Sequence, residues 1–437
     1  MEKGILLPIF SLPSKYGIGD FGYEAFEFID ILRENKIEYW EILPINESGR
    51  YPYSPISYYA LNKNYISLDK LKEMDLIDTP IQKENTSKVK YDNFKERYYK
   101  EAFIKFRPND DFINFALNSK IDEYAQYMSD KYKEDKEYYI FIQYILDKQW
   151  NELKSYANKN GVKIIGDMPI YPSYNSCEVS YYSKYYDLNN GKMEYVSGAS
   201  PDYFNSEGQK WGHPLYNFKK MEEDNFKYLI DRYKEFLYRY DIVRIDHFRA
   251  FDSYYKIPID KSAKEGFYEE GPGEKFFDEL FKYTNSSKFI VEDLGDIRKE
   301  TELLRDKYNF TRMKILQYTL NLDECCDEYN DIENMVIYPG NHDNNTIVGW
   351  YNSLSNYKKK NLEVFLRKND CYDEKINVAI IRYCLKSVAK LMIVTVQDIL
   401  GLDENSRINL PGHEYEDNWA FKLKDFDSLK SNIKVLN

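Results

Sequence analysis

Four short apolar segments of this sequence each end in a carboxylate, and we expect the chemistry of the chain to lie there. The four carboxylates are Asp167 after Ile164-Ile165-Gly166, Asp246 after Val243-Arg244-Ile245, Glu292 after Ile290-Val291, and Asp343 in Gly340-Asn341-His342-Asp343. Carboxylates at the C-terminal ends of successive parallel strands converge on one face of an α/β barrel. Such a cleft suits glycoside chemistry, in which one carboxyl is the acid, a second is the nucleophile and further groups hold the sugar.

Asp246 and Glu292 end neighbouring runs, and their surroundings favour different protonation states. Asp246 alone is equally well explained as a helix N-cap. Arg244, two residues earlier on the same strand, points to the same side and would keep Asp246 ionised, as a nucleophile requires. Glu292 could form a barrel-end ion pair. As a general acid it needs a raised pKa, which burial or the nearby charge of Asp246 would supply.

Asp343 lies in a turn-rich segment, for which a surface turn is the simpler interpretation. Its place after the apolar run Met335–Tyr338 and beside His342 favours a second interpretation, in which the two side chains bind vicinal sugar hydroxyls. The four histidines are far apart in the sequence and show no HExxH or EF-hand pattern, so we expect no metal site. The sequence also gives no indication of acyl or phosphoryl transfer, because GxSxG, P-loop and GxGxxG motifs are absent.

Eight candidate buried strands would position these residues. They are Gly4–Phe10, Tyr39–Ile45, Val162–Pro169, Ile242–Asp246, Lys288–Glu292, Met313–Gln317, Met335–Tyr338 and Leu391–Asp398. Most are continuous apolar runs of the parallel-sheet type. Helical patterns between them include Glu24–Asn35, Asp224–Tyr238, Glu274–Tyr283, Glu300–Tyr308 and Tyr357–Arg367. This order predicts an α/β fold, a (β/α)8 TIM barrel that occupies residues 1–437 as one catalytic unit.

The spacing of the strands predicts insertions on this barrel. Residues 69–145 are charged, rich in Tyr and mostly helical by pattern, so we expect a helical subdomain there. Residues 171–222 are irregular and dense in Tyr, Ser, Asn and Gly, which is typical of a binding loop or lid and predicts a substrate-covering subdomain. Residues 257–273 contain three glycines and a proline, and we expect a loop.

Composition limits which classes of partner and which cellular compartment we expect. The 437 residues carry a net charge of −12, which argues against nucleic acid or an anionic membrane as a partner. The 44 Tyr are open to two interpretations: a compositional habit of the source genome, or rings that stack on sugars. Five cysteines without a CxxC pair, and a start without a signal-peptide pattern, predict a cytoplasmic protein with reduced thiols.

Together these segments resemble the amylomaltases, the 4-α-glucanotransferases of glycoside hydrolase family 77 in the α-amylase clan. The likeness runs over nearly the whole chain and rests on Ser11-Leu12-Pro13-Ser14-Lys15-Tyr16-Gly17-Ile18-Gly19-Asp20, Tyr39-Trp40-Glu41-Ile42-Leu43-Pro44, Gly166-Asp167-Met168-Pro169-Ile170, Pro201-Asp202-Tyr203-Phe204, Gly208-Gln209-Lys210-Trp211-Gly212, Arg244-Ile245-Asp246-His247-Phe248-Arg249, Glu292-Asp293-Leu294-Gly295, Asn341-His342-Asp343-Asn344, Gln397-Asp398-Ile399-Leu400-Gly401 and Asn418-Trp419. The family lacks a separate C-terminal β-domain, and here only 39 residues follow Asp398.

The resemblance implies a role for each matching residue. Asp246 would be the nucleophile, Glu292 the acid/base and Asp343 the transition-state stabiliser. The substrate-binding residues would be Arg244, His342, Asp167, His247, Tyr51, Asp202, Tyr203, Phe204 and Trp211. It also implies that the enzyme needs no cofactor or metal. Its partners would be α-1,4-glucans such as maltooligosaccharides, starch or glycogen, together with glucose, in an oligomeric state that the sequence leaves open.

The reaction expected from the resemblance is retaining transfer of an α-1,4-glucan segment to the 4-hydroxyl of an acceptor glucan or glucose, through a covalent glycosyl-enzyme. The alternative is an α-amylase-type retaining hydrolase with the same carboxylates. Four positions depart from the family pattern: Ile56, His213, Ala250 and Asn345. Several of them lie near the expected sugar path, so we expect these to bear on chain-length preference and acceptor affinity.

Overall fold

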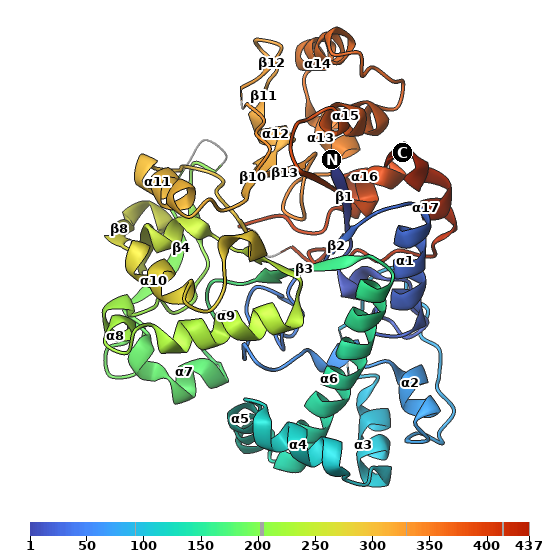
Figure 1. Cartoon of the computed structure of the whole chain (residues 1–437), viewed down its shortest axis with the longest axis vertical. Coiled ribbons are helices and arrows are strands. Elements are labelled where there is room, and N and C mark those ends of the chain that lie inside the picture. Colours follow the sequence, from blue (N-terminus) through green and yellow to red (C-terminus); the bar gives the residue numbers. More distant parts are fainter. Residues whose placement is uncertain (92, 202–204, 329, 413–414, 437) are drawn as a thin grey trace.

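All eight predicted apolar runs form strands of one parallel sheet in the computed structural model (Figure 1), which describes residues 1–437 except 92, 202–204, 329, 413–414 and 437. The strands are β1 (Glu2–Leu6), β2 (Tyr39–Glu41), β3 (Lys163–Met168), β6 (Ile242–Ile245), β9 (Phe289–Val291), β10 (Arg312–Ile315), β13 (Met335–Tyr338) and β14 (Leu391–Thr395). Their order is β10-β13-β14-β1-β2-β3-β6-β9. A parallel bridge between Ile290 and Thr311 joins the two outer strands. The predicted (β/α)8 barrel is therefore confirmed.

Seventeen α-helices are assigned among the described residues. They are α1 (Tyr23–Glu34), α2 (Leu68–Glu73), α3 (Glu96–Lys105), α4 (Asp110–Asn118), α5 (Asp122–Tyr132), α6 (Lys136–Lys159), α7 (Cys177–Tyr181), α8 (Phe218–Glu222), α9 (Lys227–Arg239), α10 (Gly273–Leu280), α11 (Lys299–Lys307), α12 (Leu316–Thr319), α13 (Ile347–Ser353), α14 (Asn356–Lys368), α15 (Ile376–Leu385), α16 (Val396–Leu400) and α17 (Asp427–Asn432). Between successive barrel strands, α1, α6, α9, α10 and α11 provide the crossover helices that parallel strands require.

The ends of the first and last strands are shorter than predicted. The chain leaves β1 after Leu6, passes Pro8 and forms a short 3₁₀ turn, Ile9–Ser11. Proline has no N–H to donate to a neighbouring strand, which explains the stop. The last apolar run turns from strand to helix at Thr395, whose side chain accepts a hydrogen bond from the Asp398 amide and caps α16. Both predicted strands extend too far, because the residues that follow each strand are also buried.

The prediction of a loop at residues 257–273 is wrong. This segment contains the end of β7 (Ser253–Pro258) and all of β8 (Phe267–Glu270), which pair antiparallel. With β4 (Tyr195–Ala199) and β5 (Gln209–Lys210) they form a four-stranded sheet in the order β5-β4-β7-β8. The glycines and proline flank β8 and do not interrupt it. The irregular segment 171–222 likewise holds α7, α8, β4 and β5.

The helices of residues 69–145 pack together beside the barrel, with α3, α4 and α5 each contacting the long α6. Figure 1 shows this group at the bottom of the view, away from β4, β8 and α10 on the left. The assignment of residues 69–145 and 171–222 as insertions on one catalytic unit stays a prediction.

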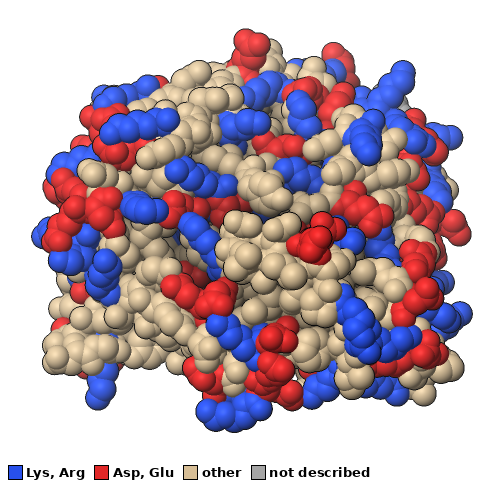
Figure 2. All heavy atoms as spheres, turned by 60° about the horizontal axis from the view of Figure 1, so that its bottom comes forward, with Lys and Arg blue, Asp and Glu red and all other residues tan. Residues whose placement is uncertain are grey.

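The surface mixes charges of both signs. On the face drawn in Figure 2, Lys and Arg lie among Asp and Glu, without one large area of a single sign. Within the described ranges, no helix is both long and apolar enough to cross a bilayer.

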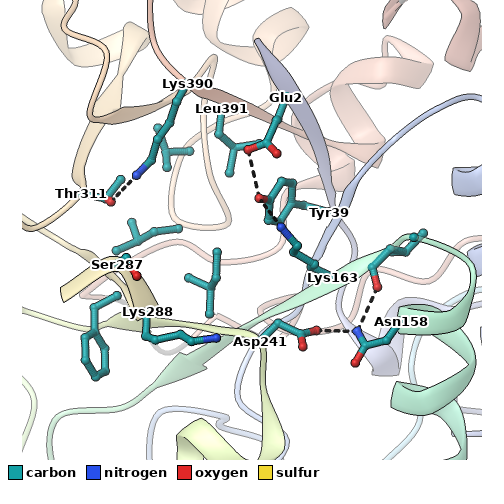
Figure 3. Close-up of a pocket in the computed structure, with 16 residues that line it drawn as sticks. Glu2, Tyr39, Asn158, Lys163, Asp241, Ser287, Lys288, Thr311, Lys390 and Leu391 are labelled. Carbon is teal, nitrogen blue, oxygen red and sulfur yellow. Dashed lines mark hydrogen bonds between the residues drawn. The ribbon is translucent and has the colours of Figure 1, made fainter. Parts of the chain in front are cut away.

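The strands open onto a pocket at each end of the barrel. Their N-terminal ends surround a pocket of about 490 Å³, with Glu2, Lys163, Asp241 and Lys390 among its lining residues (Figure 3). The segments that follow their C-terminal ends line a cleft of about 390 Å³ that includes Asp246, Glu292 and Asp343. Three of the four predicted carboxylates thus meet in one cleft, and the fourth, Asp167, is buried behind it.

Candidate active site

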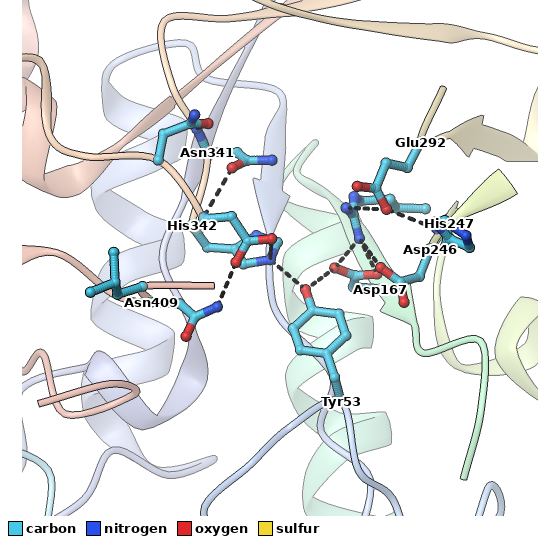
Figure 4. Close-up of polar contacts among 12 residues, drawn as sticks. Tyr53, Asp167, Asp246, His247, Glu292, Asn341, His342 and Asn409 are labelled. Atoms are coloured by element: carbon cyan, nitrogen blue, oxygen red, sulfur yellow. Dashed lines mark hydrogen bonds and ion pairs between the residues drawn. The ribbon is translucent and has the colours of Figure 1, made fainter. Parts of the chain in front are cut away.

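One buried guanidinium joins three of the predicted carboxylates. β3 and β6 pair in a register that places Asp167 opposite Arg244. The Arg244 Nη1 atom donates to both oxygens of Asp167 at 2.8 Å, and it lies 3.3 Å from Asp246 Oδ1. Its Nη2 atom lies 3.0 Å from Glu292 Oε2. Since Arg244 is 1% exposed and Asp167 fully buried, this ion pair anchors the site inside the barrel (Figure 4).

Asp246 and Glu292 are brought together by the pairing of their strands. Ile245 on β6 is the partner of Val291 on β9, so the residue that follows each strand is one of the two carboxylates. The chain then turns sharply at His247, which has a left-handed backbone with φ of 48°. This turn directs the His247 amide to Glu292 Oε2, at 2.8 Å. The carboxyl groups of Asp246 and Glu292 come within hydrogen-bonding reach of each other.

The protonation pattern is the reverse of the one expected from the sequence. Burial would raise the pKa of Glu292, but the Arg244 charge and the His247 amide together lower it to about 2. Burial and the charge of Glu292 raise the pKa of Asp246 well above its ordinary value, against the opposing effect of Arg244. Of the two carboxyls, Asp246 therefore binds a proton more readily than Glu292 does. The prediction failed because Arg244 approaches Glu292 more closely than Asp246.

A buried glutamate lies beneath these groups. Glu41 on β2 is 1% exposed and accepts a hydrogen bond from the Tyr338 hydroxyl at 2.9 Å. Burial raises its pKa to about 8, with Arg244 opposing that rise and Asp167 adding to it. Glu41 is consequently a neutral acid near pH 7, so it adds no further negative charge next to Asp167.

The opposite wall carries Asp343 and His342. The Tyr53 hydroxyl donates to Asp167 Oδ2 at 2.6 Å and lies 2.8 Å from His342 Nε2, which must then carry the proton. The Tyr53 ring stacks on the His342 ring at a centroid distance of 5.4 Å. His342 Nε2 also lies 3.4 Å from Asp343 Oδ2. Tyr53 thereby links the two walls of the cleft.

A late loop holds Asp343 from the other side. Asn409 Nδ2 donates to Asp343 Oδ1 at 2.7 Å, and the Arg407 side chain donates to the Asp343 main-chain oxygen. The Asn409 amide also donates to the His342 main-chain oxygen at 3.1 Å. The position of Asp343 therefore depends on a segment that follows the last barrel strand.

The other predicted substrate-binding residues are divided between the cleft and the undescribed part of the chain. Tyr51, Trp211 and His247 line the cleft, and the Trp211 ring meets the His247 ring edge-on at 4.8 Å. Arg244 and Asp167 lie behind the cleft wall, and His342, which is 2% exposed, is buried within the wall beside Asp343. Asp202, Tyr203 and Phe204 lie outside the described residues.

Sequence reasoning missed two residues that the structure brings into the site, Tyr53 and Asn409. Tyr53 could have been found, because it follows Tyr51 by two residues in the same Tyr- and Pro-rich segment. Asn409 carried no such signal, because it follows neither an apolar run nor a carboxylate. Among the described residues no group of three or more His, Cys, Asp or Glu could hold a metal ion.

Comparisons with known proteins give the relatives of this chain. The sequence profile of the family described as 4-alpha-glucanotransferase matches residues 7–132 and 118–428. The chain is 34% identical to a 4-alpha-glucanotransferase of Aquifex aeolicus over 99% of this chain and 98% of that protein. It is 35% identical to a 4-alpha-glucanotransferase of Clostridium butyricum, over 95% of each chain.

Among solved structures, the chain is similar to the amylomaltase from Streptococcus agalactiae in complex with acarbose. The TM-score is 0.92 at 28% identity, and the match covers 100% of this chain and 98% of that one. The amylomaltase from Corynebacterium glutamicum shares the fold, with a TM-score of 0.80 at 15% identity over 98% of this chain and 72% of that one.

Proposed function

Because this chain belongs to the 4-alpha-glucanotransferase family, we infer that its cleft moves a segment of an α-1,4-glucan from a donor to the 4-hydroxyl of an acceptor glucan or glucose. The observation that carries this conclusion is the pair Asp246 and Glu292, held on the two nitrogens of one buried guanidinium. Their close approach fits retaining enzymes, in which the two carboxyls are about 5–5.5 Å apart, better than inverting enzymes at about 6.5–9.5 Å.

We propose that Asp246 is the nucleophile and Glu292 the acid/base. Glu292 protonates the glycosidic oxygen while Asp246 attacks C1, so that the glycosidic bond breaks and a glycosyl ester forms on Asp246. In the second step the acceptor hydroxyl attacks C1, the ester bond breaks, and the hydroxyl proton passes to Glu292. Each step inverts C1, so the product keeps the α configuration.

This proposal requires the proton to move within the pair when substrate binds. The raised pKa of Asp246 and the lowered pKa of Glu292 favour a proton on Asp246, and the first step needs a proton on Glu292. The two carboxyls are within hydrogen-bonding reach, so the transfer is a single short step. A sugar at the cleft that weakens the contact between Arg244 and Glu292 would drive the transfer, because that contact lowers the pKa of Glu292.

Asp343 and His342 are proposed to hold the sugar that reacts. Asp343 presents a carboxylate to the cleft and stabilises the positive charge that develops at C1. Asp167 and Arg244 support it from the barrel interior, and the Tyr53 ring offers an apolar face to the sugar. The residues Tyr51, His247, Asp202, Tyr203, Phe204 and Trp211 remain our proposed contacts to the rest of the glucan.

The testing experiment is incubation of the purified protein with maltotriose, followed by separation of products by chain length and a count of reducing ends. Disproportionation predicts glucose and a ladder of longer maltooligosaccharides at a constant number of reducing ends. Shorter sugars alone with rising reducing ends would identify an α-amylase-type hydrolase. An unchanged substrate would contradict both activities.

We also propose a cytoplasmic location. All five cysteines are free in the structure, and three of them (Cys177, Cys371 and Cys384) are buried. Unpaired cysteines are typical of a reducing compartment. Fractionation of the source cells with an antibody against the chain tests this, and recovery in the extracellular fraction would contradict it.

A further inference from the structure

A second set of polar residues, Arg249 and Asp296, lies in the cleft on the side of Glu292, the proposed acid/base. Arg249 follows Asp246 by three residues in a short 3₁₀ turn, and Asp296 follows Glu292 by four residues. Arg249 Nη1 lies 3.0 Å from Asp296 Oδ2, and the same nitrogen donates to the Asp296 main-chain oxygen. The loops after β6 and β9 are therefore tied together on the Glu292 side of the cleft.

The Arg249 guanidinium supports one aromatic ring. Its Cζ atom lies 4.1 Å from the centroid of the Tyr268 ring, a cation–π distance. Arg249 is 6% exposed, and its Nε atom has no hydrogen-bond partner among the described residues. The guanidinium is therefore buried against the Tyr268 ring.

The Tyr268 ring is fixed at a third point and still accessible. Its hydroxyl lies 2.8 Å from Ser200 Oγ, on the segment that follows β4. Tyr268 itself sits on β8, opposite Tyr255 on β7, and 36% of it is exposed. Both Tyr268 and Ser200 line the cleft. The ring is thus a partly exposed flat surface whose orientation is set before any ligand arrives.

The position of this ring indicates which part of the glucan it meets. In glycoside cleavage the acid protonates the oxygen between the sugar that reacts and the sugar that leaves. His342 and Asp343 lie on the wall proposed to hold the reacting sugar, whereas Arg249 and Asp296 follow the strands of the catalytic pair. The leaving glucan, and later the acceptor, must therefore pass on the side of Arg249 and Tyr268.

We propose that Tyr268 is a stacking platform for the acceptor glucan, and that Arg249 and Ser200 are positioning residues that hold its ring. This inference rests on the proposed transferase function. An acceptor glucose lays its apolar face on the ring, which brings its 4-hydroxyl to the glycosyl-enzyme in place of water. Tyr268 accordingly sets how the intermediate divides between transfer and hydrolysis.

The test measures that division directly. A low concentration of α-maltotriosyl fluoride forms the glycosyl-enzyme, and glucose competes with water for it. Maltotetraose reports transfer and maltotriose reports hydrolysis, so their ratio depends only on the second step. In Tyr268→Ala the ratio should fall about tenfold, the factor that corresponds to about 1.4 kcal/mol of lost acceptor contact. Tyr268→Phe keeps the ring and should retain most of the wild-type ratio.

Two further variants complete the test. Ser200→Ala, which removes the same hydrogen bond as Tyr268→Phe, should match that variant. Tyr357→Ala removes an exposed Tyr on α14, outside the cleft, and should leave the ratio at the wild-type value. If Tyr268→Ala does not fold by circular dichroism, Tyr268→Leu replaces it.

The outcomes separate this inference from the function on which it rests. A wild-type protein that yields maltotetraose while Tyr268→Ala keeps the same ratio overturns the stacking role alone. A fall in Tyr357→Ala equal to that in Tyr268→Ala also overturns it. A wild-type protein that releases only maltotriose overturns the transferase function, and the acceptor platform with it.

Discussion

The two ends of the barrel both carry charged pockets, but they distribute their charges differently. At the N-terminal end the paired charges have separate, local partners. Lys390 Nζ donates to Thr311 Oγ1 at 2.7 Å, Tyr39 donates to Glu2 at 3.0 Å, and Asp241 accepts from the Asn158 side chain at 2.8 Å (Figure 3). At the C-terminal end one guanidinium, Arg244, is shared by three carboxylates (Figure 4).

This difference indicates which end is built for stability and which for chemistry. Locally paired charges keep the same partners whether or not a ligand is present. Three carboxylates around one cation cannot all ionise without repulsion, and burial together with the charge of Glu292 raises the pKa of Asp246. Electrostatics, and not pocket volume, therefore identifies the reactive end. This matches the general pattern of barrel enzymes, whose active sites lie at the C-terminal face.

The sharpest test of the contrast is Asp246→Asn. Loss of the nucleophile should lower kcat for maltotriose disproportionation by at least about 10⁴-fold. Stability should be equal or higher, because the substitution removes one carboxyl from the crowded set. Thermal melts and product analysis give the two numbers. Asp111→Asn, on the exposed surface of α4, is the control and should keep full activity. A residual rate within tenfold of wild type would contradict the nucleophile assignment.

Glu41→Gln tests the buried layer beneath the reactive end. The folded pKa of Glu41 is raised from 4.5 to about 8, so its folded form binds a proton that the unfolded chain has already released. The contribution of Glu41 to stability is therefore full below about pH 4.5 and is lost as pH rises from there through about 8, by about 3–5 kcal/mol in total. Gln keeps the acceptor for the Tyr338 hydroxyl and does not titrate.

The two proteins should consequently diverge with pH. Urea melts at pH 5 should give similar free energies of unfolding, and at pH 9 Glu41→Gln should be the more stable protein. Equal pH dependence in the two proteins would show that Glu41 does not carry this linkage.

Asn409→Ala tests whether the late loop positions the reactive end. Without its hydrogen bond Asp343 can rotate away from the sugar, and misplacement of a catalytic group by about 1 Å costs up to about 100-fold. We expect kcat to fall about 10- to 100-fold, with a smaller change in KM. Asn405→Ala, an exposed residue of the same loop, is the matched control. A rise in KM alone would indicate that Asn409 binds substrate and does not position Asp343.

The barrel and the carboxylates that line its cleft could be predicted because both are local signals in the sequence. Continuous apolar runs identify buried parallel strands, and Asp246 and Glu292 each follow one directly. The end of β14 could not be predicted this way, because Val396 and Ile399 are as apolar and buried in a helix as in a strand. β8 was missed because the glycines at its flanks looked like a loop.

The protonation states of the site residues were harder to predict than which residues form the site. Which carboxylate holds the proton depends on Arg244 Nη2 reaching Glu292 and on the left-handed turn at His247, and neither is visible in residue spacing. Tyr53 and Asn409 lie on long connections, where tertiary packing alone brings them to the site.

The smallest expected effect is at the inert end, in Asp241→Ala. Asp241 Oδ2 accepts hydrogen bonds from the Ile164 amide and the Asn158 side chain, both at 2.8 Å. Its removal leaves the Ile164 amide at the start of β3 without an acceptor, which should lower the free energy of unfolding by about 1–3 kcal/mol. Because Ile164 lies at the opposite end of β3 from Asp167, kcat should stay within twofold of wild type. Asp260→Ala, an exposed residue after β7, should change neither quantity. If kcat in Asp241→Ala falls by more than the loss of stability explains, the two ends are coupled through β3. The distinction between an end built for stability and an end built for chemistry would then be wrong.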